Sequence, residues 1–447
     1  MNNGVNEYAE TLSRMIRAET ISETDQVDVS KFRRFHELLR ELFPSVFKVC
    51  VYKDYNGSFL LRWPGKTTAK PSEQGLMLMN HHDVVSVGGA WEHAPFSGEV
   101  AEGKVWGRGT LDDKGPLWAM LQAAEELIAD GFIPERDVYF ESACTEETTG
   151  AGAKAIAEDL REKGFRFEMI LDEGGMMLTE PIAGAKGTFA MIGVGEKGCA
   201  DLKFIARSKG GHASSPPKDT PLVRLGKYMS FVDAKEIFSV KLSGVTCEML
   251  KRIAPHMGGA AAKVMANPEI FAPVIKTVMG KSGGTAAALL KTTIAFTRAK
   301  GSSGNNVIPD EAYVIGNMRY SHHQGRKASI DAVRKVASRY GLEVEVLDPG
   351  IESSVSDWKS RPFALVEEAV ASIFKGVVSS PYIMTGASDA RFMGILSDHC
   401  LRFAPFHITD EQLSSIHGIN ENVDIDALAP AVEFYKYVIQ HFPGTAS

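Results

Sequence analysis

The chain has 447 residues, of which 44% are hydrophobic and 23% are charged, which is a globular composition. Because this length exceeds what one hydrophobic core accommodates, we expect two domains. Its formal net charge of -7 gives no electrostatic reason to expect nucleic acid or an anionic membrane as a partner. The five cysteines are far apart and include no CxxC pair, which favours a reducing cytoplasm without disulfide bonds.

The N-terminal region predicts a helix and no export signal. Residues 5–16 carry apolar side chains at helical spacing, and the first twenty residues lack a basic start followed by an apolar run, so we expect no signal peptide. A second helical pattern at 32–42 and strand patterns at 46–52 and 58–63 follow. We therefore predict a cytoplasmic protein that begins its fold with two helices.

The run LMLMNHHD, from Leu76 to Asp83, predicts the floor of a metal site. Four apolar residues end there in Asn80, two histidines and a carboxylate, as expected of a buried strand that opens into a site at its C-terminal end. Side chains alternate along a strand, so His81 and Asp83 point the same way, and Asp83 can hold the ring of His81. The alternative is a strand end capped by polar residues that bind nothing.

Two further predicted strands also end in carboxylates. The pattern at 137–142 runs into CTEETTG, which carries Glu146 and Glu147, and the pattern at 167–171 runs into DEGG, which carries Glu173. Helical patterns separate these strands, so in an open α/β sheet their carboxyl ends meet at one crevice, where ligands bind. Alternatively, the two adjacent glutamates form a solvated acidic turn.

Asp112 lies in another loop, GRGTLDDKGP, which enters a helix opened by Pro116. The backbone and the dipole at a helix N-terminus favour negative charge there. Together, the candidate metal-site residues are His81, Asp112, Glu146, Glu147, Glu173 and His417. Two histidines and several carboxylates suit two divalent ions of the zinc, cobalt or manganese type. One shared carboxylate can bridge such ions at roughly 3.5–4 Å, and a carboxylate that binds no metal can act as a general base.

The composition changes near Gly187. Residues 188–352 combine alternating strand patterns with helices rich in Ala, Gly and Met at 222–290. We therefore predict an α/β catalytic domain made of residues 1–187 and 353–447, with an α+β domain, 188–352, inserted into it.

The sequence resembles the co-catalytic zinc metallopeptidase family that includes bacterial glutamate carboxypeptidase, aminoacylase, succinyl-diaminopimelate desuccinylase and yeast vacuolar carboxypeptidase S. The segments that carry the resemblance are HHDVV at 81–85, GRGTLDDKG at 107–115, TEETTG at 145–150, LDEGG at 171–175, GGHASSPP at 210–217, NVIP at 306–309, GASDAR at 386–391 and IHGINE at 416–421. They occur in the family's order and cover most of the chain. The resemblance implies a mixed sheet flanked by helices, as in zinc peptidases, with the inserted domain as a lid and dimerisation domain.

The resemblance also implies two bound divalent metal ions, which we expect to be zinc, with cobalt or manganese as alternatives. Asp112 would bridge both ions, and Glu146 would be the general base. The other implied ligands are His81, Glu147, Glu173 and His417. The peptide bond between Asp112 and Asp113 would be a non-proline cis bond, a strained geometry that active sites can hold.

His212, in GGHASSPP, would reach across a dimer interface and stabilise the oxyanion in the partner's site. The residues implied in binding the substrate's carboxylate or its scissile end are Asn306, Arg319 and Gly386. Each position also has a plain structural interpretation, such as an exposed loop histidine, a turn asparagine or a surface ion pair. Two positions depart from the family: Asn317 replaces the aspartate that usually supports Arg319, and Gly386 is followed by Ala387, which restricts the backbone near the substrate.

These observations favour a metal-dependent hydrolase that cleaves an amide bond in a small substrate with a free carboxylate, as a carboxypeptidase or dipeptidase. The alternative is an N-acyl-amino-acid hydrolase, because the helical insertion at 222–290 resembles that branch and carboxypeptidase S more than the desuccinylase branch. A metal-binding scaffold without activity would lack a ligand or the base, and all six candidates are present.

Two other classes lack support in the sequence. A nucleotide-dependent enzyme needs a phosphate loop, and no such motif follows a predicted strand. The longest apolar-rich region, 257–279, is interrupted by Lys263 and Pro268, so we expect no membrane span. We expect a homodimer that acts on a peptide or an N-acyl amino acid.

Overall fold

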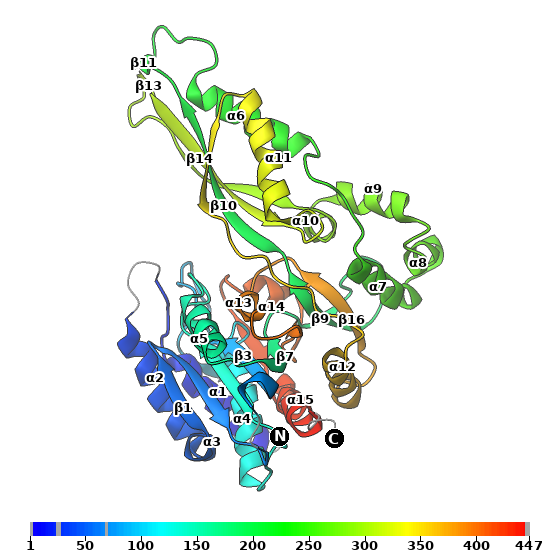
Figure 1. Ribbon diagram of the computed structural model, residues 1–447. Helices are drawn as coiled ribbons and strands as arrows, with labels where there is room; N and C mark the ends of the chain where they lie inside the picture. Colours follow the sequence, from blue (N-terminus) through cyan, green and yellow to red (C-terminus); the bar gives the residue numbers. More distant parts are fainter. Residues whose placement is uncertain (1–2, 24–27, 68–69, 443–447) are drawn as a thin grey trace.

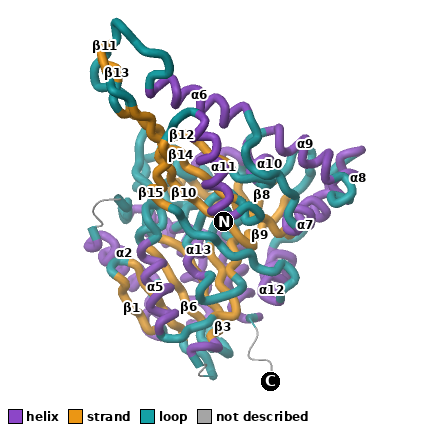
Figure 2. Tube along the Cα trace, turned by 45° about the horizontal axis from the view of Figure 1, so that its top comes forward, coloured by secondary structure: helices purple, strands orange, loops and turns teal. Residues whose placement is uncertain are grey.

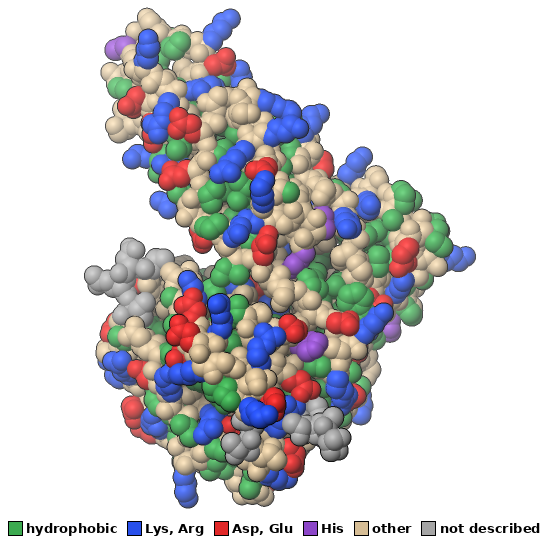
Figure 3. Space-filling view, viewed as in Figure 1, with side chains coloured by type: hydrophobic (Ala, Val, Ile, Leu, Met, Phe, Trp, Pro, Cys, Tyr) green, Lys and Arg blue, Asp and Glu red, His purple; other side chains and the backbone are tan. Residues whose placement is uncertain are grey.

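The computed structural model describes residues 3–23, 28–67 and 70–442. They form two units, each built around its own sheet, with the smaller unit projecting from the larger one (Figure 1). Lys, Arg, Asp and Glu side chains are interspersed over the face seen in Figure 3, and the surface is hollowed between the two units.

The larger unit contains a ten-stranded mixed sheet. Its strands are β1 Val51–Tyr55, β2 Ser58–Trp63, β3 Gln74–His81, β6 Val138–Ala143, β7 Phe167–Asp172, β8 Met177–Thr179, β9 Thr188–Glu196, β16 Val378–Met384, β17 Cys400–Arg402 and β18 His407–Ile408. They follow the order β1-β2-β6-β3-β7-β17-β9-β8-β18, and β16 pairs with β9 beside this path. β3 lies between β6 and β7, runs parallel to both and is buried along its whole length, which explains its apolar run.

Helices cover both faces of this sheet. One face is covered by α1 Asn3–Arg17, α2 Val29–Leu42, α3 Pro44–Val49, α4 Lys114–Ala129, α12 Arg361–Ile373 and α15 Leu428–His441. The other face is covered by α5 Ala151–Glu162 and α13 Ala390–Met393. The mixed α/β class expected from the sequence is therefore the one observed.

The smaller unit is an antiparallel four-stranded sheet with two helices on one face. Its elements are β10 Gly198–Arg207, β12 Thr293–Lys300, β14 Glu311–Tyr320, β15 Glu343–Asp348, α6 Pro221–Ala234 and α11 Gly325–Arg339. The strand order is β12-β14-β10-β15, so β12 and β15 are the edges. A short pair, β11 Gly211–His212 with β13 Val307–Ile308, lies at the far end of this unit in both Figure 1 and Figure 2.

The remaining elements are short. They are β4 Glu99–Ala101, β5 Lys104–Trp106 and β19 Asn422–Asp424, which form a three-stranded sheet, and the helices α7 Gly244–Ile253, α8 Gly259–Ala266, α9 Ala272–Ser282, α10 Gly284–Ala288 and α14 Asp410–Ser415. Three 3-10 turns are η1 Pro71–Glu73, η2 Ala254–His256 and η3 Ile425–Ala427. Within the described part of the chain, no helix is both long and apolar enough to cross a membrane.

Three local features differ from the sequence prediction. Residues 46–49, the first part of the strand predicted at 46–52, belong to helix α3, because Pro44 opens a helix at its first position. Strand β9 belongs to the larger sheet, so the change of sheet falls at Lys197, ten residues after Gly187. Helix α7 packs on strand β16 of the larger sheet and shares a buried cluster with Phe189 and Met191 of β9, so the helical insertion also covers the larger sheet. The domain limits themselves stay a prediction.

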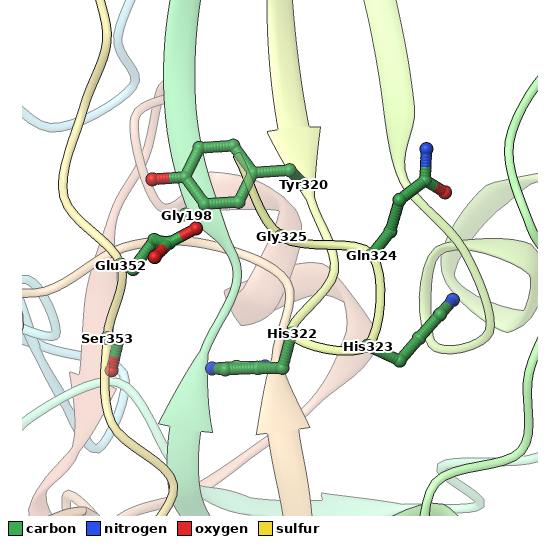
Figure 4. A pocket seen from close by; sticks show the side chains of 8 residues that line it. All are labelled: Gly198, Tyr320, His322, His323, Gln324, Gly325, Glu352 and Ser353. Carbon is green, nitrogen blue, oxygen red and sulfur yellow. The ribbon is translucent and has the colours of Figure 1, made fainter. Parts of the chain in front are cut away.

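A pocket of about 300 Å³ lies where the two sheets join (Figure 4). Gly198, at the start of β10, and Ser353, in the segment that returns to the larger unit, both line it. The ring of Tyr320 lies so close to Gly198 that a Cβ there would be 1.9 Å from it. Only glycine therefore fits where the chain leaves the larger sheet.

Candidate metal centre

The centre forms at the carboxyl ends of three neighbouring strands. Because β3 is parallel to β6 and to β7, the segments that follow these strands emerge at one edge of the sheet. His81 ends β3, the turn with Glu146 and Glu147 follows β6, and Glu173 follows β7. The convergence expected from the strand pattern is observed for these residues.

Asp112 lies between two histidines. Its Oδ1 is 3.0 Å from Nε2 of His81, and its Oδ2 is 3.0 Å from Nε2 of His417. Nε2 of His417 is also 3.1 Å from Oε2 of Glu147. Each oxygen of one carboxylate thus faces a different histidine, which is the arrangement that a bridging ligand requires.

These side chains fit a divalent cation. Ligand atoms of His81, Asp112 and Glu147 all lie within 4.8 Å of one another, and Oε1 of Glu147 is buried without a hydrogen-bond partner in the described residues. Hydrogen bonds to Asp112 and Glu147 raise the pKa of His417 to about 10. The field that stabilises the imidazolium would equally attract a cation, which competes with the proton for the same nitrogen.

Glu173 belongs to the same acidic region. Burial, together with the carboxylates of Asp113 and Asp172, raises the pKa of Glu173 well above its usual range. Its carboxylate is outside the set of three residues whose ligand atoms are close enough to share one ion.

The backbone of His417 has a φ of +59°, in the left-handed region that side-chain-bearing residues rarely adopt. Such a conformation costs of order 1–3 kcal/mol and is typical of functional sites. A strained backbone conformation therefore places the imidazole of His417 beside Asp112.

The loop that carries Asp112 is fixed by Glu421. The two carboxylate oxygens of Glu421 accept hydrogen bonds from Nη1 of Arg108 at 2.6 Å and from the backbone N–H groups of Gly109, Leu111 and Asp112 at 3.1, 2.9 and 3.2 Å. The peptide bond between Asp112 and Asp113 is cis, as expected from the resemblance. Arg108 and Glu421 had no predicted role, although both lie in motifs that carry the family resemblance.

Glu146 stands beside the proposed ligands in a mostly buried position. Burial raises the pKa of its carboxyl group to about 7. A carboxyl group with such a pKa can both accept and release a proton near neutral pH. Its Oε1 accepts a hydrogen bond from Nη1 of Arg391 at 3.3 Å, a contact that the sequence analysis did not anticipate.

The expected oxyanion residue lies apart from this centre, together with one of the expected substrate residues. His212 on β11 is exposed at the far end of the smaller unit, and the backbone carbonyl of Asn306 accepts the N–H of Ala213 beside it (Figure 1). Nε of Arg319 on β14 donates to Oδ1 of Asn317 at 3.0 Å, so the asparagine supports the arginine in place of the usual aspartate.

Gly386 lies in the loop between β16 and α13, within the larger unit. A Cβ on it would meet nothing within 4 Å, so space for an approaching ligand exists at this position.

The fold and the acidic, histidine-containing centre define a metal-dependent hydrolase. Residues 77–441 match the family described as Peptidase family M20/M25/M40, and the chain belongs to this family. It is 30% identical to N-fatty-acyl-amino acid synthase/hydrolase PM20D1 of Homo sapiens over 97% of this chain and 87% of that protein. It is 32% identical to probable carboxypeptidase S-like 2 of Dictyostelium discoideum over 97% of this chain and 85% of that protein.

Solved structures share the fold. The M20 family metallo-carboxypeptidase Sso-CP2 from Sulfolobus solfataricus superposes with a TM-score of 0.71 at 18% identity, covering 99% of this chain and 100% of that one. The Bacillus subtilis YXEP protein, a dinuclear metal-binding peptidase of the M20 family, superposes with a TM-score of 0.59 at 14% identity, covering 97% and 98%. The zinc-peptidase-like fold and the membership predicted from the motifs are confirmed.

Proposed function

We propose that this chain hydrolyses the amide bond of an N-acyl amino acid or a small peptide with a free carboxylate, using two divalent ions, with zinc as the first candidate. The observation that carries the proposal is the Asp112 carboxylate, whose oxygens lie 3.0 Å from His81 on one side and 3.0 Å from His417 on the other. Glu147 and His417 would hold one ion, and His81 and Glu173 the other.

The bound ions would lower the pKa of a water molecule and polarise the scissile carbonyl. Glu146 accepts the proton of the attacking water and then donates it to the leaving nitrogen, a role that its pKa of about 7 supports. Asp83 holds the ring of His81, since its backbone carbonyl is 3.0 Å and its Oδ1 is 3.5 Å from Nδ1. Arg319 and Gly386 would bind the substrate's carboxylate and its scissile end, and Asn306, whose carbonyl is hydrogen-bonded to Ala213 beside His212, would do so from a partner subunit.

His212 would act in the site of a partner subunit. It is exposed at the far end of the smaller unit, away from the centre of its own chain (Figure 1). Strand β12 is an edge of the smaller sheet, and an unpaired strand edge favours pairing with a second copy. We therefore propose a homodimer formed through the smaller unit, in which each oxyanion site is completed by the other subunit.

The relatives are compatible with both substrate classes, the N-acyl amino acid and the small peptide. One named N-fatty-acyl-amino acid synthase/hydrolase is 30% identical over 97% of this chain. A carboxypeptidase S-like relative of similar identity supports the carboxypeptidase alternative. A cytoplasmic location is part of the proposal, since all five cysteines are free thiols in the structure.

The decisive experiment is a metal analysis joined to a substrate screen. Purified protein is expected to bind about two zinc ions per chain, and chelator treatment should abolish amide hydrolysis until zinc, cobalt or manganese is restored. N-acyl amino acids with short and long acyl groups are compared with dipeptides and with the same substrates amidated at the carboxylate. Hydrolysis that survives complete metal removal, or that ignores the free carboxylate, would contradict the proposal.

A further inference from the structure

The carboxylate of Glu146 contacts one side chain from a distant segment of the chain. Nη1 of Arg391 donates to its Oε1 at 3.3 Å, and the Arg391 side chain is only 18% exposed. Arg391 lies in helix α13, which follows the loop with Gly386. A buried arginine beside a carboxylate forms a charge-assisted hydrogen bond, which is stronger and more directional than a neutral one.

The guanidinium group is itself held on several sides. Nη1 also donates to the backbone carbonyl of Ser388 at 2.7 Å, and Nη2 lies 3.6 Å from Oδ1 of Asp389. The ring centroid of Phe392 is 4.6 Å from Cζ of Arg391. These contacts leave the arginine one orientation, with Nη1 directed at Glu146.

Gly150 packs against the side chains of Arg391 and Phe392. It ends the turn that carries Glu146, and its φ of +65° favours glycine. A Cβ at this position would lie 2.6 Å from Nη2 of Arg391 and 2.4 Å from the ring of Phe392. The TEETTG turn and the GASDAR segment therefore pack directly on each other, with no room for a side chain between them.

The GASDAR segment is anchored to the larger sheet. The backbone N–H and the hydroxyl of Ser388 donate to Oε2 of Glu196 at 3.2 and 2.8 Å, and Nε of Arg402 donates to the same oxygen at 3.0 Å. All three residues are fully buried. Glu196 is the last residue of β9, so the support of Arg391 is continuous with a rigid strand.

We infer that Arg391 is a positioning residue for the general base: it fixes the direction of the Glu146 carboxylate, and Ser388 transmits the rigidity of the Glu196–Arg402 pair to it. The inference rests on the proposed role of Glu146. Placement of the base within hydrogen-bonding reach of the attacking water is a requirement of proton transfer, and a small misplacement is costly. Lysine carries the charge, but its single Nζ cannot reproduce both the Nη1 contacts to Ser388 and Glu146 and the approach of Nη2 to Asp389.

The test is a double-mutant cycle on the metal-loaded protein. Arg391→Met is expected to lower kcat by about 10- to 100-fold, the usual cost of removing a supporting contact, with KM little changed and zinc content retained. In the Glu146→Gln background the same substitution should have almost no further effect on kcat, because the group that it positions is already disabled. Arg391→Lys should recover part of kcat. Arg361→Met, which removes an exposed arginine paired with Glu368, is the matched control and should leave kcat unchanged.

Several results of this cycle would overturn the proposed role of Arg391. An equal loss of kcat in both backgrounds would show a general structural effect and overturn it. A raised KM with normal kcat would make Arg391 a substrate-binding residue and also overturn it. If Arg391→Met does not fold, the cycle is run with Arg391→Lys, and additivity there overturns the inference. Failure of the proposed function is separate, because it appears as absent amide hydrolysis in the unaltered, metal-loaded protein.

Discussion

Oδ2 of Asp83 accepts the backbone N–H of Glu147 at 3.2 Å. Oδ1 of the same carboxylate accepts the N–H of Glu146 at 3.2 Å and lies 3.5 Å from Nδ1 of His81. The hydroxyl of Ser22 completes the set by donating to Oδ2 at 2.6 Å. The carboxylate of Asp83 thus fixes the proposed base and a proposed ligand, and its backbone carbonyl, 3.0 Å from Nδ1, fixes the ring of His81 beside them.

Replacing Asp83 with asparagine should therefore disturb the whole centre. The amide has one acceptor oxygen, so its NH₂ group would face a backbone N–H that has lost its partner. We expect Asp83→Asn to weaken zinc affinity by roughly 10- to 100-fold, the range for supporting groups of metal ligands. Competition with a chromogenic chelator measures the affinity. Asp331→Asn, at an exposed ion pair on α11, is the control, and equal affinities for the two variants would contradict the role of Asp83.

The proposed base gives a second prediction. Glu146→Gln keeps the size of the side chain but removes its ability to accept a proton. We expect kcat to fall by roughly 10²- to 10⁴-fold, the usual contribution of a positioned acid–base group. Metal analysis of the same sample should still find the zinc, since Glu146 is not proposed as a ligand. A fully metallated variant with normal turnover would assign the base to another residue.

The sequence predicted the parts of the site that local patterns encode. A buried strand and the polar residues at its end are adjacent in the sequence, so a local pattern predicts both. This holds for the apolar run that ends in His81 and for the strand pattern that ends before Glu146. The contacts that join these ends are long-range. Asp83 could be paired with His81 from strand alternation, but its bonds to the backbone of the 146–147 turn depend on how two strands align.

Other features differ from the prediction although the sequence carries a local signal for them. Pro44 at the first position of a helix marks α3, where the first part of a strand was expected. Glu421 lies in a quoted motif, yet its function as the acceptor for the loop of Asp112 needs the two segments to be seen together. Residues 188–196 fall within the predicted inserted domain, but they form strand β9, a buried member of the larger sheet.

Glu421 and Arg108 form a buried ion pair at 2.6 Å, and both side chains are almost fully inaccessible. Removing the carboxylate with Glu421→Ala leaves a buried guanidinium unpaired, which costs about 3–5 kcal/mol of unfolding free energy. The double variant Glu421→Leu/Arg108→Met removes both charges and should be less destabilised than the single one. Urea unfolding of the metal-free proteins measures this difference. The pair would be irrelevant to stability if both variants unfolded at the same urea concentration as the unaltered chain.

Lys197 predicts a pH effect at the point where the chain changes sheets. Its Nζ donates to the carbonyl of Lys291 at 2.9 Å and to the hydroxyl of Thr293 at 3.1 Å, and burial lowers its pKa from 10.5 to about 7. Between pH 7 and 10.5 the unfolded chain binds a proton that the folded chain does not, so this lysine makes the unfolding free energy rise with pH across that window. The cost of burying the ammonium is fully present below pH 7 and absent above 10.5.

Lys197→Met should remove this slope. The slope is on the order of 1.4 kcal/mol per pH unit, which amounts to a few kcal/mol of unfolding free energy across the window. The measurement is the unfolding free energy of both proteins in urea at about pH 7 and about pH 9.5, within the window where the two states differ in bound protons. Lys335→Met, which removes an exposed lysine on α11, should keep the slope of the unaltered chain. Identical slopes for Lys197→Met and the unaltered protein would mean that the lysine keeps its ordinary pKa when buried.

The exposed position of His212 at the far end of the smaller unit predicts complementation between subunits. His212→Ala and Glu146→Gln should each be nearly inactive as homodimers, because every site lacks one group. After subunit exchange, half of the dimers contain one of each chain, and one of their two sites has both groups intact. The mixture should therefore regain about a quarter of the unaltered activity. Mixing His212→Ala with the double variant His212→Ala/Glu146→Gln is the control and should regain nothing, because no subunit supplies the histidine. Full activity of an isolated monomer, or no gain in the first mixture, would place the oxyanion donor within a single chain.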